Sequence, residues 1–256
     1  MTEFLHHKVL ISDDVHEICK TRLEAAGIEV DYRPGIKGAE LLAALKDCTG
    51  LVVRSATRVT GEIIAAGPKL QVIGRAGVGV DNIDVEEATH HGIAVLNTPE
   101  GNTTSAAEHT IGMMMALSRN IPQACAAMKA GKWSRSAFTG TEVRGKVLGV
   151  IGLGKIGREV ARRARGLDMN VVCYDPMISP AAAEATGAQL LPLDAVLEQA
   201  DYLTLHIPSN ANTHHLLDAD RLNKCKTGVR IINCARGEII DTDALLDALN
   251  SGKVAG

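Results

Sequence analysis

Three glycines, Gly152, Gly154 and Gly157, have the spacing Gly-x-Gly-x-x-Gly, which in the right context holds the phosphates of a dinucleotide. The apolar run 147–151 leads into them as a short strand would, and the run 158–165 follows them as a helix. One glycine of such a stretch makes a tight turn, one admits a pyrophosphate to the backbone, and one lets the helix pack on the strand. The helix N-terminus adds N–H groups and the positive end of its dipole. The stretch therefore predicts a dinucleotide site.

An acid stands where the adenosine ribose of such a ligand would be bound. Asp175 ends the next apolar run, 170–174, about 20 residues beyond the glycines, and an acid in that place hydrogen-bonds the ribose hydroxyls. Asp175 could instead only begin a loop before Pro176, but its position at a strand end favours the ribose role. Residues 176–178 include no Arg that would receive a 2′-phosphate, so NAD is favoured over NADP.

Three arginines follow apolar runs in the way that ligand-binding residues follow strands. Arg236 comes shortly after the run 229–232, and Arg54 and Arg75 come at or just after two runs near the start of the chain. Ligands bind at the carboxyl ends of the strands in open α/β sheets, so cations there suit an anionic substrate. The plain alternatives are a surface Arg at a turn for Arg236, and salt bridges within loops or helices for Arg54 and Arg75.

The elements that would carry these residues alternate between strands and helices. In the first hundred residues the predicted strands are 8–11, 28–30, 50–53, 70–73 and 93–96, and the predicted helices are 15–26, 39–45, 60–66 and 85–91. We expect Ser12, Asp13 and Asp14 to cap the first of these helices. Such alternation is typical of a parallel sheet with helices on both faces.

A turn-forming stretch, 97–102, interrupts this alternation, and one long helix is predicted from residue 103 to residue 117. A second α/β series follows, with strands at 147–151, 170–174, 188–191, 201–205 and 229–232 and later helices at 180–186, 193–199, 220–224 and 242–250. Residues 253–256 resemble the start of a further strand. We therefore expect an α/β fold of two Rossmann-like, doubly wound parallel-sheet domains, divided near residue 100.

Composition excludes several classes of protein. The 256 residues are 46% hydrophobic with a formal net charge of −3, which gives no reason to expect a nucleic-acid partner. The six cysteines are dispersed without a Cys-x-x-Cys spacing, so neither a disulfide framework nor a metal site is expected. No apolar stretch has the length of a membrane span, and residues 1–8, with His6 and His7 as a polar lead-in to the first strand, lack the apolar core of a signal peptide. A cytoplasmic protein without a membrane partner is expected.

Several motifs, taken in order, resemble the NAD-dependent D-isomer-specific 2-hydroxyacid dehydrogenases. They are residues 53–57, residues 74–82, residues 97–102 with Ala107 and Glu108, the glycine stretch, residues 205–208 and residues 233–237. The resemblance covers essentially the whole chain. It implies two Rossmann-like domains with a cleft between them, joined by the helix near 102–119 and assembled as a homodimer or homotetramer. Residues 1–100 would be the N-terminal part of the substrate-binding (catalytic) domain, and residues 101–256 an NAD-binding domain incomplete at its C-terminus.

The reaction that the resemblance implies is hydride transfer between C2 of a 2-hydroxy acid and C4 of nicotinamide. It needs a cation that binds the carboxylate and polarises the oxygen, and a base that takes the hydroxyl proton. The resemblance makes Arg236 the catalytic arginine. The cofactor-binding positions that it implies are Val78, Gly152, Gly154, Lys155, Ile156, Gly157, Asp175, His206, Ile207, Pro208, Cys234, Ala235 and Arg236. At the position of Val78 some relatives carry Thr.

Substrate-binding positions come partly from strand ends and partly from the resemblance. They are Arg54, Ser55, Arg75, Gly77, Val78, Asn102 and Arg135, of which Arg135 would reach the site of a neighbouring subunit or be an ordinary exposed cation. Two arginines beyond Arg236 favour a phosphorylated 2-hydroxy acid. The alternatives are another D-2-hydroxyacid dehydrogenase, acting on glyoxylate, lactate or hydroxypyruvate, and a non-catalytic NAD-binding scaffold.

The proton-transferring group is not expected within these 256 residues. His206 is the one histidine at a strand end beside the predicted cofactor site, and a cofactor-lining role suits it better than that of the base. In the family the acid–base group is a His paired with a Glu, both downstream of the Arg236 motif, and the sequence ends before either. We therefore expect a fragment of a longer enzyme that binds NAD and turns over little substrate.

Overall fold

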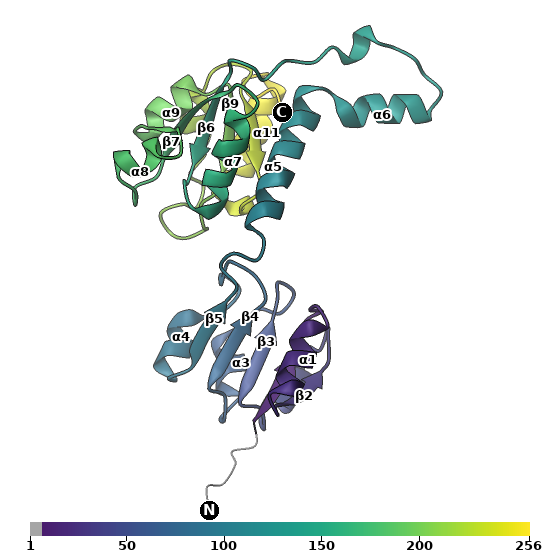
Figure 1. Ribbon diagram of the computed structural model, residues 1–256, viewed down its shortest axis with the longest axis vertical. Coiled ribbons are helices and arrows are strands. Elements are labelled where there is room, and N and C mark those ends of the chain that lie inside the picture. Colours follow the sequence, from purple (N-terminus) through teal and green to yellow (C-terminus); the bar gives the residue numbers. More distant parts are fainter. Residues whose placement is uncertain (1–6) are drawn as a thin grey trace, which may run out of the picture. The chain divides into compact units, whose positions relative to one another are not determined.

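The computed structural model describes residues 7–256, which form two compact units divided after Asn102 (Figure 1). Unit 1 ends at Asn102, and unit 2 comprises Thr103–Gly256. Of the N-terminal stretch 1–8 that was interpreted from the sequence, only His7 and Lys8 are described, so the prediction for His6 lies outside the described residues. Across the described part of the chain, no helix is both long and apolar enough to cross a membrane.

Unit 1 is built on a five-stranded parallel sheet with the strand order β2-β1-β3-β4-β5. The strands are β1 (Lys8–Ile11), β2 (Glu29–Tyr32), β3 (Gly50–Val53), β4 (Val72–Arg75) and β5 (Ala94–Asn97). Leu10, Leu51 and Ile73 are almost completely buried, because helices cover the inner strands of a parallel sheet on both faces. The chain reverses its direction of strand addition between β1 and β3. Ligands bind at the carboxyl ends of the strands beside such a point.

The helices of unit 1 are α1 (Ile18–Ala25), α2 (Gly38–Leu45), α3 (Gly61–Ala65) and α4 (Val85–His90). The predicted cap at residues 12–14 is wrong, because α1 begins only at Ile18 and Glu17 precedes it without a capping side chain. Ser12 and Asp13 are buried and face β3 instead. The Asp13 carboxylate accepts hydrogen bonds from the loop after β3, which satisfies both the buried charge and the loop backbone.

Unit 2 contains a second five-stranded parallel sheet, with the order β10-β9-β6-β7-β8. Its strands are β6 (Val147–Ile151), β7 (Asn170–Tyr174), β8 (Gln189–Leu190), β9 (Tyr202–Leu205) and β10 (Arg230–Asn233). The point of reversal lies between β6 and β9. The last residues run beside β10, where Val254 pairs with Val229 as an isolated bridge rather than as the predicted strand. The predicted α/β class with two parallel sheets is confirmed.

The helices of unit 2 cover this sheet, except for one segment that extends from it. They are α5 (Thr103–Ser118), α6 (Ile121–Lys129), α7 (Lys155–Arg165), α8 (Pro180–Glu184), α9 (Leu193–Gln199), α10 (Ala219–Lys224) and α11 (Thr242–Asn250), with short 3₁₀ turns at η1 (Ser136–Phe138) and η2 (Gly237–Ile239). Inside the core, Ser118 donates a hydrogen bond to the hydroxyl of the fully buried Tyr202 at 2.9 Å. Figure 1 shows α6 and the loop after it projecting from the rest of unit 2.

Candidate cofactor and substrate sites

The three glycines after β6 differ in their surroundings, and each difference matches one requirement of a dinucleotide site. Gly152 has a φ of +92°, and a Cβ there would lie 2.7 Å from the carbonyl oxygen of His206. A Cβ on Gly157 would collide with the carbonyl oxygen of Gly152. A Cβ on Gly154 would meet no atom within 4 Å. Thus Gly152 makes the turn, Gly157 permits close packing of helix on strand, and Gly154 leaves its backbone open to a ligand.

Helix α7 begins at Lys155, three residues before the predicted start, with Gly154 as its N-cap. The Arg158 N–H closes the first turn onto the carbonyl of Gly154 at 3.0 Å. Lys155, Ile156 and Gly157 therefore form the first turn, where backbone N–H groups have no acceptor within the helix itself. These donors and the positive end of the helix dipole are suited to phosphate oxygens.

Asp175, at the end of β7, connects that strand to the glycine turn. Its Oδ2 accepts a hydrogen bond from the Leu153 N–H at 2.9 Å, and its Oδ1 accepts one from the Met177 N–H at 2.9 Å. A carboxylate has about four acceptor positions, so two remain for other donors. The half-buried Asp175 can therefore receive ribose hydroxyls while it holds the turn.

The residues after β9 lie against the glycine turn. A Cβ on Gly152 would also approach the side chain of Ile207 to 2.6 Å, so this part of the β9 loop packs against the turn. Pro208 is exposed, and its carbonyl accepts a hydrogen bond from Thr213 at 2.6 Å. Burial lowers the pKa of His206 to about 4, and its Nε2 lies 2.9 Å from the Thr204 hydroxyl. A neutral imidazole that holds protons so weakly is a poor base near pH 7.

The end of β10 forms a turn that presents Arg236. The Asn233 side chain accepts a hydrogen bond from the Ala235 N–H at 3.0 Å and donates one to the Arg236 carbonyl at 2.8 Å. Nη1 of Arg236 donates to the Ala235 carbonyl at 3.0 Å. Cys234, Ala235 and Arg236 are all half-buried. Asn233 was not among the predicted site residues, although it fixes the backbone that carries Arg236.

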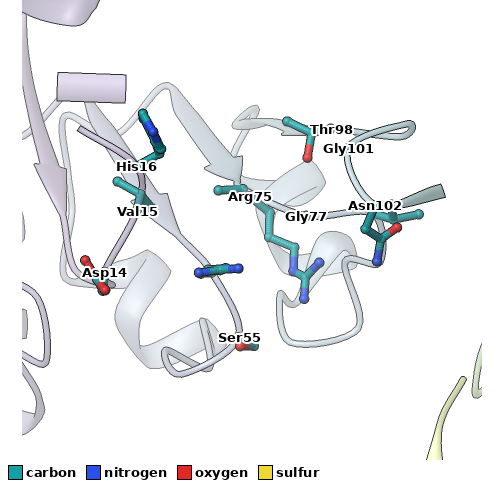
Figure 2. Close-up of a pocket in the computed structure, with 12 residues that line it drawn as sticks. Asp14, Val15, His16, Ser55, Arg75, Gly77, Thr98, Gly101 and Asn102 are labelled. Atoms are coloured by element: carbon teal, nitrogen blue, oxygen red, sulfur yellow. The ribbon is translucent and has the colours of Figure 1, made fainter. Parts of the chain in front are cut away.

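Unit 1 contains a pocket of about 720 Å³ at the carboxyl ends of its strands (Figure 2). It brings together all the substrate-binding residues predicted in this unit, namely Arg54, Ser55, Arg75, Gly77, Val78 and Asn102. Its other lining residues are Asp14, Val15, His16, Ala76, Thr98 and Gly101. The pocket therefore lies beside the reversal point of the sheet, where a ligand is expected.

The pocket is lined by more positive than negative charge. The Arg54 guanidinium, and Nη1 and Nη2 of Arg75, have no hydrogen-bond partner among residues 7–256, whereas Nε of Arg75 donates to Oδ1 of Asn82 at 3.1 Å. Asp14 is the carboxylate of the lining, and it accepts a hydrogen bond from the Tyr32 hydroxyl at 3.0 Å. Two guanidinium groups with unused donors favour an anion with more than one charge.

Several lining residues escaped the sequence analysis. Val15 and His16 follow β1, and Thr98 follows β5. His16 accepts a hydrogen bond from the Ile18 N–H on its Nδ1 at 3.2 Å, which leaves Nε2 for other contacts. The strand order would have indicated residues after β1, because they stand at the reversal point, but the sequence does not reveal which strands are neighbours.

Arg135 lies in unit 2, in the segment that follows α6. Its guanidinium stands 5.3 Å from the ring centroid of the exposed Trp133. A smaller pocket of about 190 Å³ is lined by Ala124, Met128, Lys132, Trp133, Ser134, Arg135 and Phe138. Among the described residues, no group of His, Cys, Asp and Glu side chains is arranged to hold a metal ion.

Comparison with known proteins gives one family. Residues 111–256 match the family model described as D-isomer specific 2-hydroxyacid dehydrogenase, NAD binding domain. A D-3-phosphoglycerate dehydrogenase of Rattus norvegicus is 52% identical over 97% of this chain, and the match covers 47% of that relative. The chain thus spans about half the length of the curated relatives that it matches.

Solved structures share the fold over nearly the whole chain. A glyoxylate reductase from Paecilomyes thermophila has a TM-score of 0.90 and 33% identity, and the match covers 98% of this chain and 80% of that one. A D-lactate dehydrogenase from Aquifex aeolicus, complexed with NAD and lactic acid, has a TM-score of 0.87 and 30% identity. This match covers 97% of this chain and 75% of that one. A glyoxylate reductase and a D-lactate dehydrogenase therefore share this architecture.

Proposed function

Because this chain belongs to the D-isomer specific 2-hydroxyacid dehydrogenase family and carries its NAD-binding domain, we propose that it serves the NAD-dependent oxidation of 3-phospho-D-glycerate to 3-phosphohydroxypyruvate. This reaction is the first step of the phosphorylated route to L-serine. Membership of the family does not specify the acid. The observation that favours a phosphorylated acid is the presence of two guanidinium groups with unused donors in a single pocket of unit 1. The 52% identity to a protein named D-3-phosphoglycerate dehydrogenase supports the same substrate.

Unit 2 would hold the cofactor through groups that it already has in place. The open backbone at Gly154 and the first turn of α7 would bind the pyrophosphate, and Asp175 would accept the ribose hydroxyls. His206, Ile207 and Pro208, together with Cys234 and Ala235, would line the site. Bound NAD supplies the acceptor for the hydride.

Unit 1 would recognise the charge of the substrate. Arg54 and Arg75 would bind its anionic groups, with Ser55 and Asn102 as further donors and with Gly77 and Val78 lining the pocket. Arg236 would bind the carboxylate and polarise the oxygen at C2. With a pKa of about 4, His206 would stay neutral and would not act as the base.

The assembly and location belong to the same proposal. We propose a homodimer or homotetramer in which Arg135 serves a neighbouring subunit, as the exposed segment after α6 would allow. We also propose a cytoplasmic location, which the six free cysteines support, because reducing compartments keep thiols unpaired.

Titration calorimetry on the 256-residue chain tests this function. NAD should bind at least tenfold more tightly than NADP, and 3-phosphoglycerate at least tenfold more tightly than D-glycerate, because two cations meet the added phosphate charges. Equal affinity for D-glycerate and 3-phosphoglycerate would favour a reductase of unphosphorylated acids, such as the glyoxylate reductase that shares this fold. NAD binding with no affinity for either acid would favour a non-catalytic NAD-binding protein.

A further inference from the structure

One amide side chain connects the two arginine-bearing segments of the unit 1 pocket. Nδ2 of Asn82 donates to the Arg54 carbonyl at 2.8 Å and to the Thr57 carbonyl at 2.6 Å. Oδ1 of the same side chain accepts the hydrogen bond from Nε of Arg75 at 3.1 Å. Both amide hydrogens and the amide oxygen are thus in use, and each partner belongs to a segment that lines the pocket or adjoins it.

A second contact sets the course of the Arg75 side chain. A Cβ on Gly77 would collide with Nη1 of Arg75 and would lie 2.9 Å from its Cζ, so the guanidinium lies directly over the glycine backbone. That backbone is itself fixed, because the Gly77 N–H donates to the Arg75 carbonyl at 2.8 Å and the Thr98 N–H donates to the Gly77 carbonyl at 3.0 Å. Any larger residue at position 77 would displace the guanidinium.

The loop that carries Arg54 is held from its other side by Asp13. Oδ2 of Asp13 accepts hydrogen bonds from the Arg54 N–H at 2.6 Å, the Ala56 N–H at 3.2 Å and the Thr57 N–H at 3.1 Å. Burial acts to raise the pKa of Asp13, but these bonds and that from the Thr57 hydroxyl outweigh it and hold the pKa below its usual range. The loop backbone is therefore rigidly placed between a buried carboxylate and the Asn82 amide.

These contacts leave a defined set of donors for a ligand. With Nε of Arg75 bound to Asn82, its Nη1 and Nη2 are the donors that remain, and Figure 2 shows the side chain pointing from the end of β4 toward the loop that carries Ser55. A guanidinium fixed in advance loses less conformational entropy when an anion binds. Since Asn82 also holds the Arg54 backbone, one side chain fixes the position of both arginine-bearing segments.

We propose that Asn82 and Gly77 are positioning residues that hold Arg75 and the Arg54 loop as one pre-formed binding unit for a multiply charged acid. This inference rests on the proposed function, in which the acid is 3-phosphoglycerate. Neither residue needs to touch the acid for this role, since Gly77 acts through Arg75, and Asn82 acts through Arg75 and the Arg54 loop. Asn82 does not line the pocket, which is why the spacing of charged residues gave no indication of it.

The positioning can be tested without substrate, by the Nε–H resonance of Arg75 in the nitrogen-15 spectrum of the 256-residue chain. The wild-type proton should exchange slowly with water because it is hydrogen-bonded, and Asn82→Ala should raise the exchange rate at least tenfold. Asn82→Asp should keep the slow exchange, since a carboxylate still accepts from Nε. Equal exchange rates in wild type and Asn82→Ala would overturn the proposal.

Binding tests the consequence for the ligand. We expect Asn82→Ala and Gly77→Ala each to weaken 3-phosphoglycerate about tenfold, with unchanged affinity for NAD. In an Arg75→Ala background the effect of Asn82→Ala should fall to threefold or less, because residues that act through one another are not additive. If Asn82→Ala weakens binding by the same factor in wild type and in Arg75→Ala, then Asn82 has a merely structural role and the proposal is overturned.

Thr49→Val is the matched control for loss of structure in the same unit. Thr49 pairs with the backbone N–H and carbonyl of Lys8, both at 3.2 Å, at the amino edge of the sheet and away from the pocket. This variant should lower the midpoint of thermal unfolding while both affinities stay within twofold of wild type. A wild-type chain that fails to bind 3-phosphoglycerate would refute the proposed function, whereas the exchange rates would still decide whether Asn82 positions Arg75.

Discussion

The Asp175 carboxylate accepts a hydrogen bond from the Leu153 N–H at 2.9 Å, so the acid at the end of β7 and the glycine turn after β6 form one structure. The same carboxylate accepts from the Met177 N–H through its other oxygen. The turn that we propose for the phosphates and the acid that we propose for the ribose therefore support each other. A change at Asp175 should alter both the ribose contact and the shape of the turn.

We predict that Asp175→Asn weakens NAD binding about tenfold, because one acceptor oxygen becomes a donor and the negative charge opposite the ribose hydroxyls is lost. Calorimetric titration with NAD and NADP would measure this, and the preference for NAD should shrink as well. Asp194→Asn, which breaks the exposed pair with Lys224 in the same unit, is the control and should leave affinity unchanged. An affinity for NAD within twofold of wild type would contradict the ribose role.

The glycine turn allows stability and binding to be separated. Gly154→Ala places a Cβ in open space at a φ of −69°, so it should leave the free energy of unfolding unchanged and weaken NAD binding at least tenfold by obstructing the pyrophosphate. Gly157→Ala drives a Cβ into the Gly152 carbonyl, which should destabilise unit 2 by about 1–3 kcal/mol. Urea unfolding and calorimetry measure the two effects. The interpretation fails if Gly154→Ala binds NAD as the wild type does.

The glycine stretch also shows why part of the site could be predicted from the sequence. Local spacing determines the strand, the turn and the helix there, since Gly152, Gly154 and Gly157 act within a few residues of one another. The alternation of strands and helices likewise indicated both sheets, and Arg54 and Arg75 stood at predicted strand ends. These features depend on short-range periodicity and backbone conformation, which one sequence contains.

Other features depend on contacts between distant segments and could not be predicted. Asp13 was expected to cap a helix but binds the loop at residues 54–57, because strand order brings β1 and β3 together. His16 lies at the pocket for the same reason. The role of Asn82 depends on three partners from two segments, and nothing in its neighbourhood along the chain distinguishes it from a turn residue.

The free energy of unfolding should depend on pH through His206. Its pKa falls from 6.5 to about 4 on folding, so between these values the unfolded chain binds more protons and stability rises with pH. Stability should therefore be lost as the pH falls from about 6.5 toward 4, by about 1–2 kcal/mol at pH 5 relative to pH 7.5. Urea unfolding of wild type and His206→Gln isolates this contribution, which the variant should lack. If both proteins lose stability equally as the pH falls, His206 does not have a lowered pKa in the folded state.

The charge of the unit 1 pocket should decide between phosphorylated and unphosphorylated acids. Arg54→Ala removes a guanidinium that has no protein partner in the described residues, so the fold should be unaffected, with an unfolding midpoint close to that of wild type. Affinity for 3-phosphoglycerate should fall at least tenfold, whereas affinity for D-glycerate should change less, because we expect the lost charge to bind the phosphate group, which only the former carries.

Arg58→Ala is the control for that prediction, since Arg58 is an exposed arginine four residues further along the chain that does not line the pocket. The dependence on ionic strength provides a second measurement, because salt screens the attraction between the exposed Arg54 and the acid. Added salt should therefore reduce the ratio of the affinity for 3-phosphoglycerate to that for D-glycerate, and this reduction should be larger in wild type than in Arg54→Ala. If both acids lose affinity equally in Arg54→Ala, then Arg54 binds the carboxylate that they share. In that case Arg75, the other arginine that lines the pocket, is the candidate for binding the phosphate.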